Sequence, residues 1–241
     1  MKLNHLTVNE VFGPTFQGEG RYAGRACAFL RLAYCNLSCI WCDTPFTWNW
    51  TGTDFIHPDK YDKDKETHDM TNAEIVARIS KFDVGHLVIS GGEPLLQQTR
   101  LIPFLRMLKA SGPYFVEVET NGTIMPTKEF LPWVDQINCS PKLSNSGDAT
   151  HLRIKPKVLQ FLTHCNKVDF KFVIGPRQEI DEVEGFRALF GISKERVWLM
   201  PLGKTKDELK ANSFIEYIAK AQGFNFSPRL QIETYGDKRG V

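Results

Sequence analysis

The feature that most constrains this chain is a run of three cysteines, Cys35, Cys39 and Cys42, in the spacing Cys-x-x-x-Cys-x-x-Cys. Three thiolates this close in sequence can hold one small inorganic group from a single loop. Proteins usually hold an iron–sulfur cluster through four cysteines, and no fourth cysteine lies near these three in the sequence. A four-iron cluster held by three thiolates leaves one iron open to a further ligand, so the loop predicts a reactive centre.

Two other roles for these cysteines stay open at this point. A structural zinc site usually needs a second Cys pair or a His pair, and the other three cysteines of the chain are isolated from one another. A thioredoxin-like pair would use only Cys39 and Cys42 and would leave Cys35 unexplained. A disulfide cluster needs a higher cysteine content than six in 241 residues. The spacing therefore favours an iron–sulfur cluster over zinc or redox-active thiols.

The rest of the chain alternates strand-like and helix-like segments. A short strand is predicted over Leu6–Phe12, followed by a glycine-rich loop and six further strands at 26–33, 86–90, 114–120, 133–139, 167–175 and 196–200. Helical patterns lie at 71–82, 95–110, 180–189 and 207–221, the first with a Thr71/Glu74 capping box. This alternation predicts an α/β fold built from parallel βαβ units, with residues 1–241 as one domain.

Composition and charge exclude several classes of function. The net charge of +2 in 241 residues is nearly neutral, which argues against a nucleic-acid-binding surface. The first ten residues lack the apolar core of a signal peptide, and no apolar run approaches the ~20 residues that a membrane helix needs. With cluster-type cysteines, these features predict a cytoplasmic protein that contacts no membrane.

Three motifs together carry a resemblance to a known family. The stretch "CNLSCIWCDT" resembles the cluster loop of the radical S-adenosylmethionine superfamily, and "FGPTFQGEG" upstream and "ISGGEP" downstream narrow the match to the 7-carboxy-7-deazaguanine synthase family. The resemblance runs from about Val11 to the C-terminus. It implies a partial, open (β/α) barrel of the radical S-adenosylmethionine type with about six parallel core strands and fewer helices than usual.

The resemblance also implies the reaction and its cofactors. A [4Fe–4S] cluster on the three cysteines, S-adenosylmethionine and Mg²⁺ would convert 6-carboxy-5,6,7,8-tetrahydropterin into 7-carboxy-7-deazaguanine with loss of ammonia, on the route to queuosine and other deazapurines. It further implies a homodimer and a small electron donor such as flavodoxin or ferredoxin.

Residues that would bind S-adenosylmethionine follow from the same resemblance. The strand-to-helix turn "SGGEP" would place Gly92 at the cofactor and Glu93 against its cationic amino group, although the turn alone is typical of an ordinary helix start. The implied cofactor-binding residues are Gly92, Glu93, Ser140, Pro141 and Lys142.

The residues implied for the substrate and for Mg²⁺ lie near the cysteine loop. Arg31 suits a carboxylate because its guanidinium can donate two parallel hydrogen bonds, and its alternative is an ion pair with Glu19 or Asp43. Thr44 matches the Mg²⁺ position, and the C-terminal "YGDKRGV" is expected to fold over the substrate. The implied substrate-binding residues are Phe16, Gln17, Gly18, Glu19, Arg31 and Ser90.

Two other functions compete with the synthase reaction that the resemblance implies, and each can be distinguished from it. Glycyl-radical activating enzymes share the style of cysteine loop, but they act on a partner protein and need a groove for a peptide. A zinc-stabilised binding module would be colourless, whereas a protein with an iron–sulfur cluster is brown.

Overall fold

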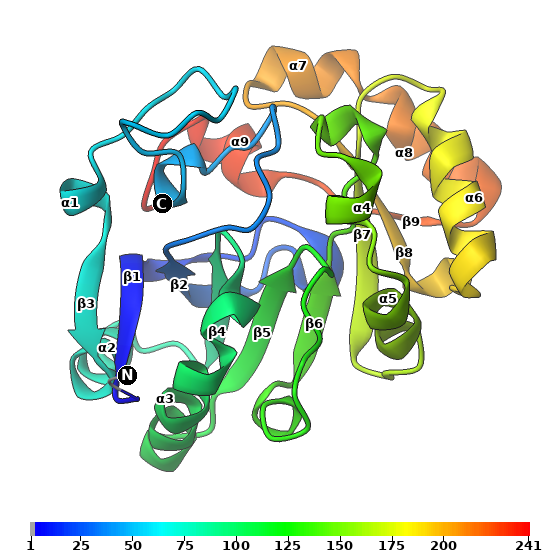
Figure 1. Cartoon of the computed structure of the whole chain (residues 1–241). Coiled ribbons are helices and arrows are strands. Elements are labelled where there is room, and N and C mark those ends of the chain that lie inside the picture. The colour runs from blue at the N-terminus through cyan, green and yellow to red at the C-terminus, as the bar shows by residue number, and fades with distance from the viewer. Residues whose placement is uncertain (1–2) are drawn as a thin grey trace.

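The fold is organised around one curved β-sheet. The computed structural model describes residues 3–241, and within them nine strands form a single sheet in the order β3-β1-β2-β4-β5-β6-β7-β8-β9 (Figure 1). The strands are β1 His5–Phe16, β2 Ala26–Leu32, β3 His68–Thr71, β4 His86–Gly91, β5 Phe115–Thr120, β6 Gln136–Cys139, β7 Val168–Ile174, β8 Val197–Pro201 and β9 Asn225–Phe226.

The strand directions confirm the predicted open barrel. The six strands predicted after the glycine-rich loop are β2 and β4 to β8, and they are neighbours that pair in parallel. The pairs of β1 with β2 and with β3 are antiparallel. The sheet begins at β3 and ends at β9, so the barrel is not closed.

Helices connect most of the parallel strands and cover the convex face of the sheet (Figure 1). The helices of the described residues are α1 Lys63–Glu66, α2 Asn72–Ser80, α3 Gln98–Ser111, α4 Thr150–Arg153, α5 Pro156–Thr163, α6 Glu179–Phe190, α7 Lys206–Ala211, α8 Phe214–Gln222 and α9 Leu230–Tyr235. Helix α9 follows the last strand and therefore connects no pair of strands. Between β5 and β6 the crossover has only a 3-10 turn at Leu131–Trp133, in keeping with the expected shortage of helices. None of the helices in residues 3–241 combines the length and apolar character needed to cross a membrane.

The two faces of the sheet differ in chemistry because strand side chains alternate between faces. Toward the helices, Ile89, Val118 and Phe172 belong to one apolar cluster with Leu101 and Leu105 of α3, and all five are fully buried. Burying a side chain of this size stabilises the fold by about 1.5–3 kcal/mol. This layer is the apolar core.

The face inside the barrel is polar, which the sequence analysis does not anticipate. Strands β5, β6 and β7 carry buried or nearly buried Glu117, Glu119, Asn138, Asp169 and Lys171 at alternate positions between their apolar residues. Buried groups of this kind are stable only when they pair with one another. The interior is therefore a hydrogen-bonded network that opens toward the carboxyl ends of the strands.

Several boundaries differ from the prediction. Strand β1 continues past Phe12 to Phe16, which pairs with Ala26 beyond a register irregularity, so the first four residues of the predicted loop are strand. The predicted helix at 207–221 is two helices, α7 and α8, interrupted where the Asn212 side chain donates to the Leu202 carbonyl. The short strands β3 and β9 were not predicted because four and two residues carry too little periodicity.

We expect the capping box at α2 to be the main local determinant of that helix start. The Thr71 hydroxyl accepts from the Glu74 amide at 3.2 Å, and Glu74 accepts from the Thr71 amide at 2.8 Å. Thr71→Ala should lower the free energy of unfolding by about 1 kcal/mol, measured by urea unfolding at equal cluster content. Thr150→Ala, at an exposed helix start capped by no side chain, is the control. An equal effect of both substitutions would contradict this.

Candidate active site

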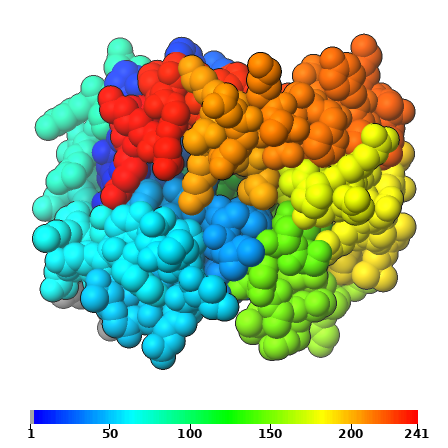
Figure 2. Space-filling view, turned by 90° about the horizontal axis from the view of Figure 1, so that it is seen from above, coloured from blue at the N-terminus to red at the C-terminus, as the bar shows by residue number. Residues whose placement is uncertain are grey.

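A cavity of about 250 Å³ lies at the carboxyl ends of the parallel strands. Figure 2 shows its mouth between the C-terminal segment (red), the segment after β8 (orange) and the cysteine loop (blue). Twelve of the fifteen predicted site residues line this one cavity: Gln17, Gly18, Glu19, Arg31, Cys35, Cys39, Cys42, Thr44, Ser90, Gly92, Ser140 and Lys142. Phe16, Glu93 and Pro141 lie off its wall.

The three cysteines come from the loop that follows β2, and the surrounding segments hold this loop in place. Asp148 accepts a hydrogen bond from the Ser38 amide at 2.9 Å and from the Cys39 thiol at 3.2 Å. The Trp48 ring N–H donates to the Cys42 sulfur at 3.4 Å. A ring N–H directed at a sulfur favours its thiolate form, as a metal ligand requires.

The cysteine thiols fit a cluster that brings its own positive charge. Burial raises the pKa of Cys35 to about 12 and also raises the pKa of Cys39 and Cys42, so the free thiols are protonated. Metal binding must displace these protons. Across residues 3–241, no three Cys, His, Asp or Glu side chains are grouped tightly enough to hold a single ion.

The turn after β4 brings backbone and not charge to the cavity. A Cβ on Gly92 would lie 2.1 Å from the Tyr34 carbonyl oxygen, so only glycine lets this turn pack against the start of the cysteine loop. Glu93 is fully buried, and its carboxylate accepts from the Leu95 amide, the Asn121 amide and the Thr120 hydroxyl. In this structure Glu93 joins the ends of β4 and β5, and Gly92 is the group that faces the cavity.

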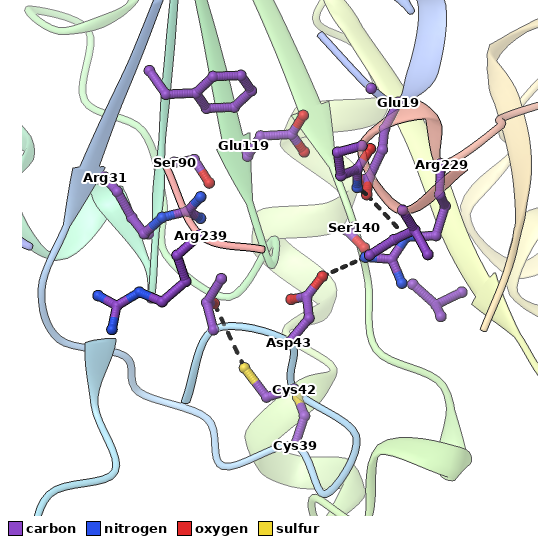
Figure 3. A pocket seen from close by; sticks show the side chains of 18 of the residues that line it. Glu19, Arg31, Cys39, Cys42, Asp43, Ser90, Glu119, Ser140, Arg229 and Arg239 are labelled. Carbon is purple, nitrogen blue, oxygen red and sulfur yellow. Dashed lines mark hydrogen bonds and ion pairs between the residues drawn. The ribbon is translucent and has the colours of Figure 1, made fainter. Parts of the chain in front are cut away.

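Glu19 is the centre of a buried charge network on one side of the cavity (Figure 3). It accepts from Lys171 of β7 at 2.5 Å, from Arg229 at 3.2 Å and from Gln231 at 2.7 Å. Arg229 also pairs with Asp43, next to Cys42, and donates to the Gly203 carbonyl. Burial would raise the pKa of Glu19, but Lys171 and Arg229 outweigh it and lower that pKa to about 2.

Gln17 lies in the cavity wall, and its side chain is bonded to carboxylates inside the barrel. It is 2% exposed, and its side-chain amide donates to Glu117 and, at 3.3 Å, to Glu119. Asn138 donates to the same two carboxylates. Gln17 therefore connects the predicted substrate loop to the polar interior of the barrel, and its backbone is bonded to Arg25 and Gly24 of the same loop.

Arg31 lies on the opposite side of the cavity, near Arg239 (Figure 3). Its Nε donates to Glu10 at 2.7 Å, so its ion-pair partner is neither Glu19 nor Asp43. Its guanidinium lies over the rings of Phe12 and Phe46, at 5.5 and 5.8 Å from their centroids. Among residues 3–241 no hydrogen bond engages its two Nη atoms, which leaves the fork available to a carboxylate.

The C-terminal segment, which the resemblance places over the substrate, forms part of the cavity wall. Residues 236–241 line it, and Arg239 stacks on Phe46 with its guanidinium 3.6 Å from the ring centroid. Arg239 also pairs with Glu66 at 2.8 Å. Met200 of β8 lines the cavity too.

Sequence reasoning missed three residues of the site: Glu119, Lys171 and Arg229. Glu119 and Lys171 lie on predicted strands, at positions that face the inside of the barrel. Because side chains alternate between the two faces of a strand, this alternation could have indicated that both face the interior. Arg229 lies in an irregular stretch before α9, where no local pattern indicates burial.

We expect Glu19 to make stability depend on pH. A carboxyl whose folded-state pKa is lowered from 4.5 to about 2 adds stability above pH 5 that disappears as the pH falls toward 2, at most about 3 kcal/mol. The stability advantage of the wild type over Glu19→Gln should therefore be largest near pH 6 and shrink steadily on acidification, measured by urea unfolding at each pH. A difference that stays constant with pH would contradict this account.

Comparison with known proteins agrees with this geometry. Residues 16–162, more than half of the chain, match the family model described as "4Fe-4S single cluster domain". Among curated proteins, the chain is similar to the 7-carboxy-7-deazaguanine synthase of Pyrobaculum aerophilum, at 38% identity over 98% of this chain and 97% of that protein. It is also similar to that of Halobacterium salinarum, at 32% identity over 96% and 91%.

A solved structure shares the fold. The crystal structure of QueE from Escherichia coli superposes with a TM-score of 0.69 at 24% identity, covering 92% of this chain and 93% of that one. These matches confirm the resemblance that the cysteine loop and its flanking motifs predict. The chain therefore belongs to the family of 4Fe-4S single cluster domains and to that of the 7-carboxy-7-deazaguanine synthases.

Proposed function

We propose that this chain is a radical S-adenosylmethionine lyase that converts 6-carboxy-5,6,7,8-tetrahydropterin into 7-carboxy-7-deazaguanine and ammonia. The observation that carries the proposal is one cavity lined both by the three cysteines and by the charged side chains of Arg31 and Glu19. Its relatives at up to 38% identity over almost the whole chain bear the name of that synthase.

Cys35, Cys39 and Cys42 would hold the [4Fe–4S] cluster, with S-adenosylmethionine beside it against Gly92, Ser140 and Lys142. Lys142 donates to the Ser140 hydroxyl at 3.0 Å and lies over the Trp41 ring, so its ammonium is positioned at the cluster side of the cavity. When bound there, the cluster and S-adenosylmethionine would supply the radical chemistry for taking a hydrogen atom from carbon 6 of the pterin.

The chain's own residues would orient the substrate between two charged walls. The free Nη pair of Arg31 suits the pterin carboxylate because both atoms can donate in parallel. The aromatic rings of Phe12, Phe29 and Phe46 supply apolar surface beside Arg31, and Phe12 and Phe29 stack at 5.0 Å. Ser90, Gly18 and Gln17 border the remaining space.

Mg²⁺ is part of the proposal through Thr44. Its side chain lies in the cavity wall, 3.7 Å from the Cys42 sulfur. Mg²⁺ keeps several waters and needs few protein oxygens, so one hydroxyl and the substrate could suffice.

We also propose that the protein is a cytoplasmic homodimer and that it receives electrons from a flavodoxin or ferredoxin.

Alanine substitutions of the three loop cysteines test this function. Anaerobically reconstituted wild type should be brown and release 7-carboxy-7-deazaguanine and ammonia from the carboxytetrahydropterin. Cys35→Ala, Cys39→Ala and Cys42→Ala should each lose cluster iron and product, because the open-cornered cluster needs all three thiolates. Cys165→Ala, an isolated cysteine away from the cavity, is the matched control and should retain both.

The outcomes separate the proposed reaction from its rivals. Wild-type protein with a full cluster that cleaves S-adenosylmethionine but forms no deazapurine would reject the reaction. Hydrogen abstraction from a partner protein in place of the pterin would support an activating enzyme.

A further inference from the structure

Glu119 is a carboxylate at the floor of the cavity that the proposed function leaves without a role. It lies near the carboxyl end of β5, its side chain is 18% exposed, and it lines the cavity. In Figure 3 its carboxylate lies between Ser90 and Glu19. A carboxylate in this place is both sheltered from bulk water and within reach of a ligand.

The groups that face Glu119 come from four segments and do not fully satisfy it. Lys171 donates to its Oε2 at 3.0 Å, and Asn138 and Gln17 donate to its Oε1 at 3.1 and 3.3 Å. Glu117 and Glu19 are its nearest like charges. These bonds are longer than the 2.5 Å between Lys171 and Glu19, so Lys171 is shared unequally between two carboxylates.

This unequal sharing separates the two carboxylates in acidity. Burial, together with Glu117 and Glu19, raises the pKa of Glu119 against the opposing effect of Lys171, while the pKa of Glu19 is lowered. Two neighbouring carboxyls whose environments push their pKa values apart are typical of an acid–base site and its fixed counter-charge. Glu19 is then the permanent anion, and Glu119 is the group that can gain and lose a proton.

We propose that Glu119 is the catalytic acid–base residue for ammonia release, an inference that rests on the proposed function. After ring contraction, the closed-shell intermediate carries an amino group on one carbon and hydrogens on the neighbouring ring methylene. Glu119 removes one methylene proton, and the C–H electron pair becomes the new carbon–carbon double bond. The C–N bond breaks, and its pair leaves with nitrogen, which takes the proton back from Glu119 as ammonia. One proton is accepted and one is returned, so no outside reagent is needed.

Neither neighbouring carboxylate fits this role. Glu19 accepts from three donors and is held as an anion by Lys171 and Arg229. Glu117 is fully buried, lies off the cavity wall and pairs with His86 at 2.9 Å. Glu117→Gln removes a carboxylate from the same network without touching the cavity, so it is the matched control for Glu119→Gln.

The test separates hydrogen abstraction from ammonia release. With substrate deuterated at carbon 6, reconstituted Glu119→Gln should still transfer label to the deoxyadenosyl group at a rate close to that of the wild type. Product and ammonia should fall by at least about 100-fold, as expected for loss of a general base, and a compound with the mass of the substrate should accumulate. Substrate affinity of the cluster-free protein, measured by calorimetry, should change little.

Three results would overturn the proposal: product formation by Glu119→Gln at nearly the wild-type rate, an equal loss of label transfer and product, or the same split in Glu117→Gln. Glu119→Asp keeps a carboxylate and should regain part of the ammonia release. This variant also provides a test if Glu119→Gln fails to fold. If wild-type enzyme forms no deazapurine, the proposed function itself fails, and this outcome is distinct from a defect confined to the variant.

Discussion

The buried ion network around Glu19 is the interaction on which the cavity depends. Lys171 reaches it from the barrel, Arg229 and Gln231 reach it from the C-terminal region, and Glu19 itself belongs to the loop after β1. Removing one partner of a buried pair leaves an uncompensated charge and costs about 3–5 kcal/mol. The network therefore fixes three distant parts of the chain to one another, and the cavity is the space that they enclose.

The same network reaches the cysteine loop, so the two halves of the site are physically coupled. Arg229 bridges Glu19 and Asp43, and Asp43 directly follows Cys42. Backbone contacts reinforce this arrangement: the Leu230 amide donates to the Gly18 carbonyl at 3.1 Å, and the Gly20 amide donates to the Ser227 hydroxyl at 2.8 Å. Glu119 lies on the barrel side of this network, where Lys171 donates both to it and to Glu19.

The sequence predicts the parallel strands and the cysteine loop because both depend on local patterns. Apolar runs predict β2 and β4 to β8, and the spacing of Cys35, Cys39 and Cys42 needs no tertiary information. The orientation of Glu93 and Gln17 was not predictable, since both side chains bond to residues far away in the chain. Arg229 was not predicted for the same reason. Its side chain is only 4% exposed, and it pairs with Glu19 and Asp43, which are both far from it in the sequence. Long-range charge pairing has no local signature.

Hydrogen exchange on Glu19→Gln tests most directly whether this network holds the site together. Amides in α9 and in the loop at 17–20 should exchange faster than in the wild type, because their anchors to the barrel are weakened, while amides in α3 keep their protection. Glu216→Gln, an exposed position on α8, should leave all three regions unchanged. Unaltered exchange in α9 and in the 17–20 loop of Glu19→Gln would contradict the account.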